Sequence, residues 1–152
     1  MRIRKFKTED AKEVSRLISK TLRKINSKDY SKKTVNTLIN HRSPKKIISK
    51  SETRHYYLAV EGSKIIGVGS YSEDDLHSFF VLPEYLGKGV GRKIIERVLK
   101  EVVKEGIKVM NCASTPYAEN FYKKIGFKKI KKKTVDYFGY KLPIILMKKR
   151  LK

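Results

Sequence analysis

A glycine-rich turn followed by a helix is the stretch of this sequence best suited to chemistry. Residues 79–82 are apolar, Pro83 starts a turn, and residues 86–92 read Leu-Gly-Lys-Gly-Val-Gly-Arg. A helix that starts just after alternating glycines leaves several backbone N–H groups free, and its positive dipole end adds to them. This combination favours the binding of phosphate. The alternative is a glycine-rich connection without a ligand, because short glycine motifs also occur by chance.

The helix after this turn is predicted by an apolar stripe at helical spacing. Its members are Val90, Ile94, Ile95, Val98, Leu99, Val102 and Val103. Gly106 stands where a helix C-cap is expected. Two familiar phosphate loops do not fit the turn. No hydroxyl for magnesium follows Gly91, and the G-x-G-x-G spacing departs from the dinucleotide fingerprint.

Two separated motifs resemble those of the GNAT superfamily of acyl-CoA-dependent N-acyltransferases. Residues 80–91, Phe-Val-Leu-Pro-Glu-Tyr-Leu-Gly-Lys-Gly-Val-Gly, are similar to the family's strand and pyrophosphate loop, usually written Q/R-x-x-G-x-G/A. Residues 118–127, Ala-Glu-Asn-Phe-Tyr-Lys-Lys-Ile-Gly-Phe, are similar to its A-x-x-F/L-Y-x-x-x-G-F segment. The sequence departs from the family at Leu86, where Gln or Arg is usual, and at Thr115, where Asn is frequent.

The resemblance implies acetyl transfer from acetyl-CoA to a primary amine, on a small molecule or a protein, by direct attack in a ternary complex. It also implies that strands at residues 76–82 and 108–112 splay apart, so that backbone groups near Phe79 to Val81 pair with the pantetheine arm. A backbone N–H near Val81 is expected to stabilise oxygen charge. The residues expected to bind the cosubstrate are Phe79, Phe80, Val81, Leu86, Gly87, Lys88, Gly89, Val90, Gly91, Arg92, Lys93 and Tyr122.

Tyr122 is the expected general acid. It matches the family tyrosine near the thioester sulfur, and its phenol is suited to protonate the leaving thiolate. The alternative is a packing role beside Phe121.

The general base is expected among the polar residues where the central strand begins. Glu73, Asp74, Asp75 and His77 cluster there, and Asp75 and His77 are the candidates. The alternative is a solvated acidic turn, with His77 half-buried in the strand.

Cys112 and the three histidines do not predict further chemistry. No partner base accompanies Cys112, so we interpret it as a small buried strand residue. His41, His55 and His77 lie far apart in the sequence without flanking ligands, and no metal site is predicted.

Length and composition favour one folded domain over residues 1–152. The longest apolar runs are too short to cross a bilayer, and the first residues have no signal-peptide core. A single cysteine excludes an internal disulfide. We therefore expect a cytoplasmic protein with no membrane partner.

The charge has three interpretations, since 37 Lys and Arg against 15 Asp and Glu give a net charge of +22. The densest run, residues 123–133, is suited to a nucleic-acid or ribosome surface. Alternatively, lysines at 123–124 join Lys88, Arg92 and Lys93 around the phosphates of CoA. The third interpretation is a solvated lysine-rich face. The alternative function is therefore a basic nucleic-acid- or ribosome-binding module on the same fold, with little or no catalysis.

Apolar periodicity and turn residues predict the remaining elements. Strands are expected at residues 1–7, 54–60, 64–71, 76–82, 108–112, 127–136 and 140–149. Helices are expected from an N-cap at Thr8, after Ser31, and at residues 90–105 and 117–125, and Ser43-Pro44 is expected to start a short third turn. The fold class is α/β (α+β), with a GNAT-like mixed, largely antiparallel sheet flanked by helices. A free edge strand near the C-terminus is suited to a homodimer.

Overall fold

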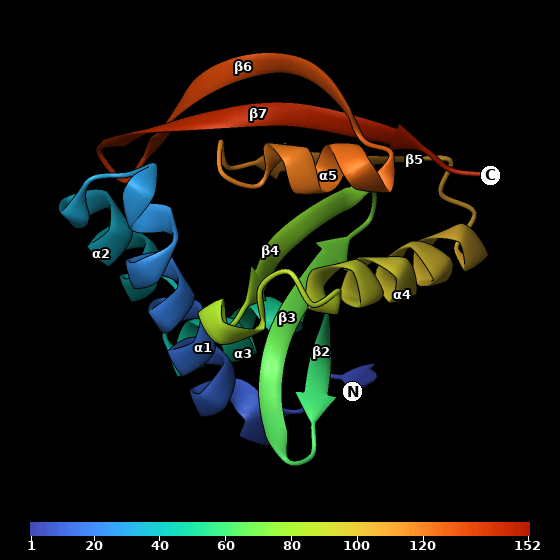
Figure 1. Cartoon of the computed structure of the whole chain (residues 1–152), viewed down its shortest axis with the longest axis horizontal. Helices are drawn as coiled ribbons and strands as arrows, with labels where there is room; N and C mark the ends of the chain where they lie inside the picture. Colours follow the sequence, from blue (N-terminus) through green and yellow to red (C-terminus); the bar gives the residue numbers. More distant parts are fainter.

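Seven strands form one mixed sheet in the computed structural model, which describes residues 1–152. The strands are β1 (Arg2–Lys5), β2 (His55–Glu61), β3 (Lys64–Ser72), β4 (Asp75–Val81), β5 (Val109–Ser114), β6 (Lys128–Tyr137) and β7 (Tyr140–Arg150). Their order is β1-β2-β3-β4-β5-β7-β6 (Figure 1). Only β4 and β5 pair in parallel; every other pairing is antiparallel. The predicted fold class is confirmed.

Five helices flank the sheet. They are α1 (Ala11–Lys24), α2 (Lys32–Asn40), α3 (Pro44–Ser51), α4 (Val90–Lys104) and α5 (Glu119–Ile125). Most of the stripe predicted for α4 faces the sheet, with Ile94, Ile95 and Val98 fully buried, but the predicted member Val103 is 43% exposed, near the C-terminal end of the helix. α4 packs against β2 and β3, whereas α1 packs against β3, β4 and the other two N-terminal helices. No helix has the length and apolar character needed to cross a membrane.

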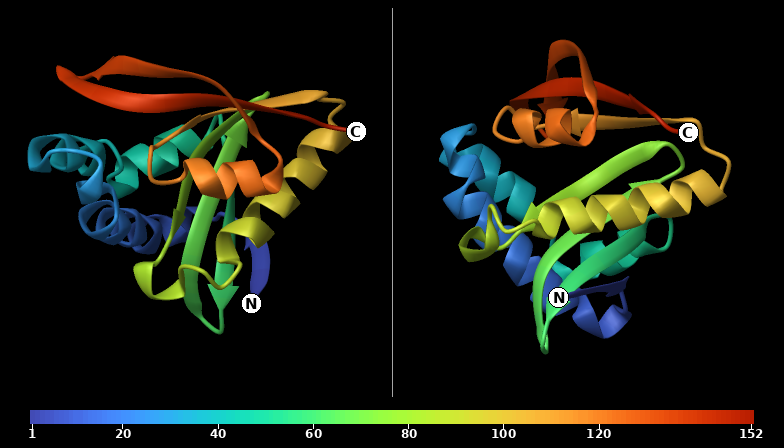
Figure 2. Two further views of the ribbon diagram at one scale, coloured as in Figure 1. Left: turned by 45° about the horizontal axis from the view of Figure 1, so that its top comes forward. Right: turned by 45° about the vertical axis from the view of Figure 1, so that its right-hand side comes forward.

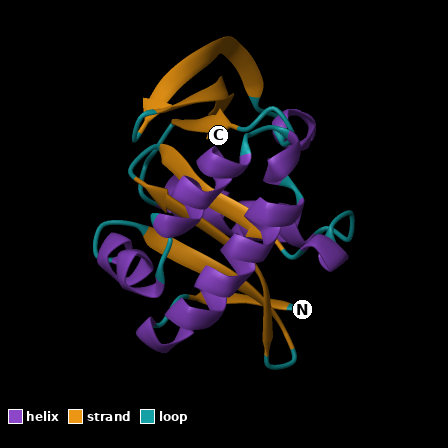
Figure 3. Ribbon diagram, turned by 90° about the vertical axis from the view of Figure 1, so that its left-hand side faces the viewer, coloured by secondary structure: helices purple, strands orange, loops and turns teal.

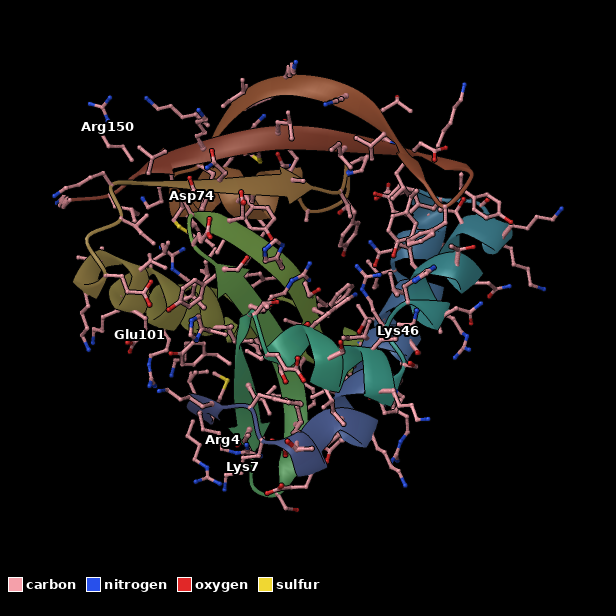
Figure 4. All side chains as sticks on the ribbon, turned by 180° about the vertical axis from the view of Figure 1, so that it is seen from behind. Arg4, Lys7, Lys46, Asp74, Glu101 and Arg150 are labelled. Carbon is pink, nitrogen blue, oxygen red and sulfur yellow. The ribbon has the colours of Figure 1, made fainter.

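The sheet opens between β4 and β5. Their pairing is limited to Asp75 and Asn111, where the Asn111 N–H donates to Asp74 O over 2.7 Å and its Nδ2 donates to Asp74 Oδ2 over 3.1 Å. Beyond this point the two strands diverge, as Figure 2 shows. In the view from behind, Asp74 lies in the turn between β3 and β4, next to β5 (Figure 4). The predicted splayed strand pair is confirmed.

A bulge interrupts the pairing of β3 with β4 close to this opening. Ser70 lies opposite His77 and Val68 opposite Phe80, so two residues of β4 oppose one residue of β3. Ser78, one of the two, has a φ of +45°, a left-handed conformation that is uncommon outside glycine. Bulges bend a strand and re-aim its backbone and side chains. The bulge therefore sets the direction of β4 where it leaves β5.

Two glycines in β3 bring α4 close to the sheet. A Cβ atom on Gly69 would lie 2.5 Å from the Phe79 ring and 2.7 Å from Ile94, and a Cβ on Gly67 would lie 2.8 Å from Ile94. Any other residue at these positions would push α4 or Phe79 outward. The helix start is thus held against β3 by close packing.

The start of α1 differs from the prediction. The expected N-cap Thr8 begins a 3₁₀ turn, Thr8–Asp10, and Asp10 accepts a hydrogen bond from the Lys7 N–H over 2.8 Å. Arg4 holds the same carboxylate with two hydrogen bonds of 2.9 Å (Arg4 and Lys7 are labelled in Figure 4). Asp10 therefore caps this turn, because an ion pair with β1 fixes it there. By contrast, Ser31 caps α2 as predicted and accepts from the Thr34 N–H.

The N-terminal helices and the β6–β7 hairpin meet over the open end of the sheet. Figure 3 shows the helices in front of the sheet with the hairpin above them. The Tyr30 hydroxyl donates to Pro143 O over 3.2 Å, and the His41 ring stacks on Phe138 with 3.7 Å between centroids. β6 is the free edge strand at this end of the sheet.

Candidate active site

The predicted phosphate loop has six consecutive free backbone donors. None of the N–H groups from residue 87 to residue 92 donates a hydrogen bond within the protein; the first helical N–H to do so is that of Lys93, to Gly89 O. Gly87 and Gly89 adopt left-handed conformations with φ of +77° and +81°. Alternating backbone conformations of this kind turn successive N–H groups toward one concavity that favours anions. The loop and the uncapped start of α4 together form that concavity.

Leu86 differs from the residues that follow it. Its N–H donates to Pro83 O over 3.3 Å and closes the 3₁₀ turn Pro83–Tyr85, so the free donors begin at Gly87. Its side chain still contributes to the wall of the cavity described below. Gly91 also has a different role from the other loop glycines. A Cβ there would lie 3.1 Å from the Phe121 ring, so Gly91 allows α4 to pack against α5.

A cavity of about 960 Å³ lies between the splayed strands and extends from the loop toward the N-terminal helices. Its wall includes most of the residues predicted to bind the cosubstrate: Phe79, Phe80, Val81, Leu86, Gly87, Gly89, Val90, Gly91, Arg92 and Tyr122. Lys88 and Lys93 are exposed and lie outside this wall. No Asp or Glu lines the cavity.

The backbone of β4 offers polar groups to this cavity. The Leu82 N–H donates to Ile66 O, toward β3. Because donor direction alternates along an antiparallel strand, the N–H of Val81 points away from β3 and into the gap on the β5 side. The carbonyl of Val81 accepts a hydrogen bond of 3.0 Å from Thr21 Oγ1 of α1. Thr21, which no motif marked, thereby anchors α1 to the strand beside the cavity.

Tyr122 lies at the floor of the cavity, on α5. Its ring packs edge-on against Phe79, Phe121 and Phe127, and its hydroxyl has no hydrogen-bond partner in the protein. Burial, with a smaller contribution from Cys112, raises the pKa of the phenol far above its ordinary value. The phenol is therefore protonated at neutral pH and free to donate into the cavity.

His77 lines the cavity and is half-buried on β4. Its Nε2 lies 2.8 Å from Ser72 Oγ. Burial, together with the positive charges of Arg54 and Lys50, lowers the pKa of the imidazole to about 4. His77 is thus a neutral imidazole at pH 7 and a weak base.

Asp75 lies apart from the other predicted catalytic residues. It is exposed at the β4–β5 junction and does not line the cavity. Its pKa is raised by partial burial and by the neighbouring Asp74 and Glu73. The structure thus brings Tyr122 and His77 to one cavity and leaves Asp75 outside its wall, at the β4–β5 junction.

The structure also shows where Cys112, Thr115 and the lysines at 123–124 lie. Cys112 is buried on β5, and burial raises the pKa of its thiol to about 12, as suits an unreactive strand residue. Thr115 lines the cavity, but its hydroxyl accepts a hydrogen bond from the Ala118 N–H. Of the two lysines expected near phosphate, Lys124 lines the cavity and Lys123 pairs with Glu119 over 2.8 Å.

Two arginines in the cavity wall were not predicted. Arg42 follows α2 and Arg54 precedes β2, and both line the end of the cavity away from the loop. Neither lies in a motif or an amphipathic pattern, so no signal in the sequence marks them.

Comparison of the chain with known protein families identifies its activity. The profile described as "Acetyltransferase (GNAT) domain" matches residues 21–151. The chain belongs to the GNAT acetyltransferase family. This GNAT protein is therefore an acyltransferase, and the cosubstrate of its family is acetyl-CoA. No curated protein matches it at a significant level.

Solved structures share the fold of this GNAT protein along nearly its whole length. A GCN5-related N-acetyltransferase from Rhodopseudomonas palustris is 21% identical, with 99% of this chain and 95% of that chain covered and a TM-score of 0.93. The PaiA N-acetyltransferase from Thermoplasma acidophilum, in complex with coenzyme A, is 22% identical, with 99% and 98% covered and a TM-score of 0.80. YncA, a putative acetyltransferase from Salmonella typhimurium with its cofactor acetyl-CoA, is 17% identical, with 100% and 94% covered and a TM-score of 0.72.

Proposed function

We propose that residues 1–152 form one N-acetyltransferase domain that transfers an acetyl group from acetyl-CoA to a primary amine by direct attack in a ternary complex. One observation carries the proposal. Six consecutive N–H groups, at residues 87–92, are unpaired, and five of these six residues line a cavity between splayed strands in a chain of the GNAT family. An array of free donors at a helix start is suited to a diphosphate.

The chain's own residues fit such a donor along the whole cavity. The amides of residues 87–92, with Arg92 and Lys124 at the wall, are the groups that would hold the phosphates. The unpaired edge of β4 from Phe79 to Val81 would hold an amide-containing arm by strand-like pairing. When bound, acetyl-CoA supplies an acetyl thioester that an amine can attack.

Two groups act near the reacting atoms in this proposal. The Tyr122 phenol, protonated and without a partner, donates its proton toward the thiolate that leaves. The Val81 N–H, which points into the gap between β4 and β5, stabilises negative charge on the acetyl oxygen. Both groups are held by the rigid elements β4 and α5, which keeps their spacing constant.

Removal of the proton from the amine does not depend on a strong base in this proposal. No carboxylate lines the cavity, and His77, with a pKa of about 4, accepts protons weakly. Lys50 does not line the cavity, but it lies near the two arginines that do, and burial with the charges of Arg42, Arg54 and Lys46 lowers its pKa to about 8. An ammonium that binds near the same arginines would lose its proton more readily than in water.

The test is a panel of amines with acetyl-CoA, scored by release of the free thiol. We expect saturable thiol release with at least one amine and saturable binding of CoA by calorimetry. Absence of CoA binding to the folded protein would contradict the proposal.

A second function, nucleic-acid binding, is supported by one observation. Residues 128–134 of the edge strand β6 are all exposed, and five of them are lysines. Phosphate backbones bind such surfaces by counterion release. A salt-titrated gel shift with DNA and RNA tests this: tight, steeply salt-dependent binding without acetyl transfer would favour the second function over the first.

A further inference from the structure

The end of the cavity away from the phosphate loop carries positive charge without an acidic partner. Arg42 and Arg54 both line this end, and neither belongs to any of the ion pairs in the chain. Guanidinium groups in a partly buried wall are normally paired with carboxylates, because an uncompensated charge in such a place is unfavourable. The missing counter-charge is therefore expected from a ligand.

Arg42 is held in position by groups that leave part of its guanidinium free. Its Nη1 donates to Leu38 O over 3.0 Å and to the Tyr137 hydroxyl over 3.2 Å. Its Nε is buried and has no hydrogen-bond partner. The guanidinium carbon lies 5.9 Å from the centroid of the Phe80 ring, on β4. The α2–α3 junction and the β6–β7 hairpin thus aim an arginine at the strand that borders the reaction site.

Arg54 adds a second positive charge at the same end. It lies beside the Tyr56 hydroxyl and close enough to His77 to lower the pKa of that imidazole. Burial, with smaller contributions from Arg42 and Arg54, also lowers the pKa of Lys50. No acidic residue opposes them in this group. A further positive charge on the acceptor would be repelled, whereas a negative charge would be attracted.

We propose that the acceptor is a small amine that carries an anionic group, a carboxylate or a phosphate, and that Arg42 and Arg54 bind this group. The inference rests on the proposed acetyl transfer and names its substrate class. Because Arg42 lies 5.9 Å from the ring of Phe80, on the strand proposed to hold the cosubstrate, we expect the anion and the reacting amine to be close together in the acceptor. Planar guanidiniums match both carboxylate and phosphate oxygens. Polyamines are disfavoured by the same charges.

Matched acceptor pairs test the proposal on the wild-type protein. β-Alanine is compared with β-alaninamide, phosphoethanolamine with ethanolamine, and spermidine serves as the polycationic acceptor. We expect kcat/KM at least about tenfold higher for one member with an anionic group than for the partner that lacks it, as for a charge-assisted hydrogen bond. The pair with the larger difference in kcat/KM shows whether the bound group is a carboxylate or a phosphate. Equal values within both pairs, or a preference for spermidine, would overturn the proposal.

Binding is measured separately from turnover. Calorimetry with the protein saturated with CoA should detect the preferred amine with an anionic group and not the partner that lacks this group. If CoA binds and amines without an anionic group are acetylated equally well, the inference fails while the proposed function stands. If CoA does not bind and no amine is acetylated, the proposed function itself fails.

Arginine variants assign the anion to its site. Arg54→Gln and Arg42→Gln should each raise KM for the anionic acceptor about tenfold or more, with little change in KM for acetyl-CoA. Lys45→Gln is the matched control, because Lys45 is exposed on α3 and does not line the cavity; it should leave both values unchanged. Since Arg42 also bonds to Leu38 and Tyr137, Arg54→Gln is the decisive variant. Unchanged selectivity in a folded Arg54→Gln protein would contradict the assignment.

Discussion

The two ends of the cavity both favour negative charge, but they achieve it with different parts of the chain. The loop end uses main-chain N–H groups at residues 87–92, which come from one continuous segment. The opposite end uses the side chains of Arg42 and Arg54, which come from two separate connections and converge only in the folded protein. A main-chain site needs glycines at set spacings and leaves a motif, whereas a side-chain site leaves none. The comparison explains why the donor is easier to infer than the acceptor.

The largest effect is expected between the two ends, at Tyr122. Tyr122→Phe removes the only proposed proton donor and should lower kcat on the order of 100-fold, while CoA binds with unchanged affinity because the phosphate loop is intact. Turnover and calorimetric affinity are measured side by side. Tyr140→Phe, on the hairpin and outside the cavity wall, is the control. Unchanged turnover in Tyr122→Phe would remove this residue from the mechanism.

The loop end is tested next by Gly89→Glu. The substitution places a carboxylate at a left-handed position beside the free donors, so the affinity for CoA should fall roughly 10- to 100-fold. Gly62→Glu supplies a matched control, because Gly62 is also left-handed with open space around it, in the β2–β3 turn. Calorimetry that shows equal CoA affinity for both variants would contradict a main-chain phosphate site.

A substitution in the close packing behind the loop is expected to have a smaller effect, on the free energy of unfolding. Gly69→Ala puts a methyl group within 2.5 Å of the Phe79 ring and 2.7 Å of Ile94. Overpacking of this kind typically costs about 1–3 kcal/mol. Denaturant titration should show this loss, and the shift of α4 should also weaken CoA binding. An Ala variant as stable as the parent would show that α4 is not held by this contact.

The smallest effect belongs to the opposite end and concerns pH. The folded pKa of His77 is about 4 and its ordinary value is 6.5, so the unfolded chain binds more protons between these values. Stability that is fully present above pH 6.5 is therefore lost as the pH falls toward 4. Titration of the His77 ring by NMR should give an inflection near 4, and His77→Gln should reduce the slope of stability with pH. A ring that titrates near 6.5 would mean that neither burial nor the charges of Arg54 and Lys50 act on the imidazole as described.

Much of the fold follows from local patterns in the sequence. The apolar stripe from Val90 to Val102 predicted α4, and Ser31 and Pro44 marked the starts of two helices. The glycines at 87 and 89 predicted the loop, since only a segment with free left-handed positions can turn successive N–H groups toward one ligand. Each of these patterns involves residues that are close together in the sequence.

Features that depend on distant residues were not predicted. Nothing in the sequence marks Gly67 and Gly69, because their role depends on the packing of α4 against them in the folded protein. The N-cap at Thr8 was wrong because Arg4, across the turn, fixes Asp10 in its place. Asp75 and His77 are close in sequence, but Asp75 pairs with Asn111 at the β4–β5 junction, whereas His77 lies further along β4, where the strands have parted, and lines the cavity.

The most direct test of the account is an NMR titration of the ¹⁵N-labelled protein with CoA. The account predicts that the backbone amide signals of residues 87–92 shift together and saturate at one equivalent, while those of Gly62 and Gly139, in distant turns, stay in place. If calorimetry shows CoA bound but these six signals do not move, the diphosphate is held elsewhere and the account is contradicted.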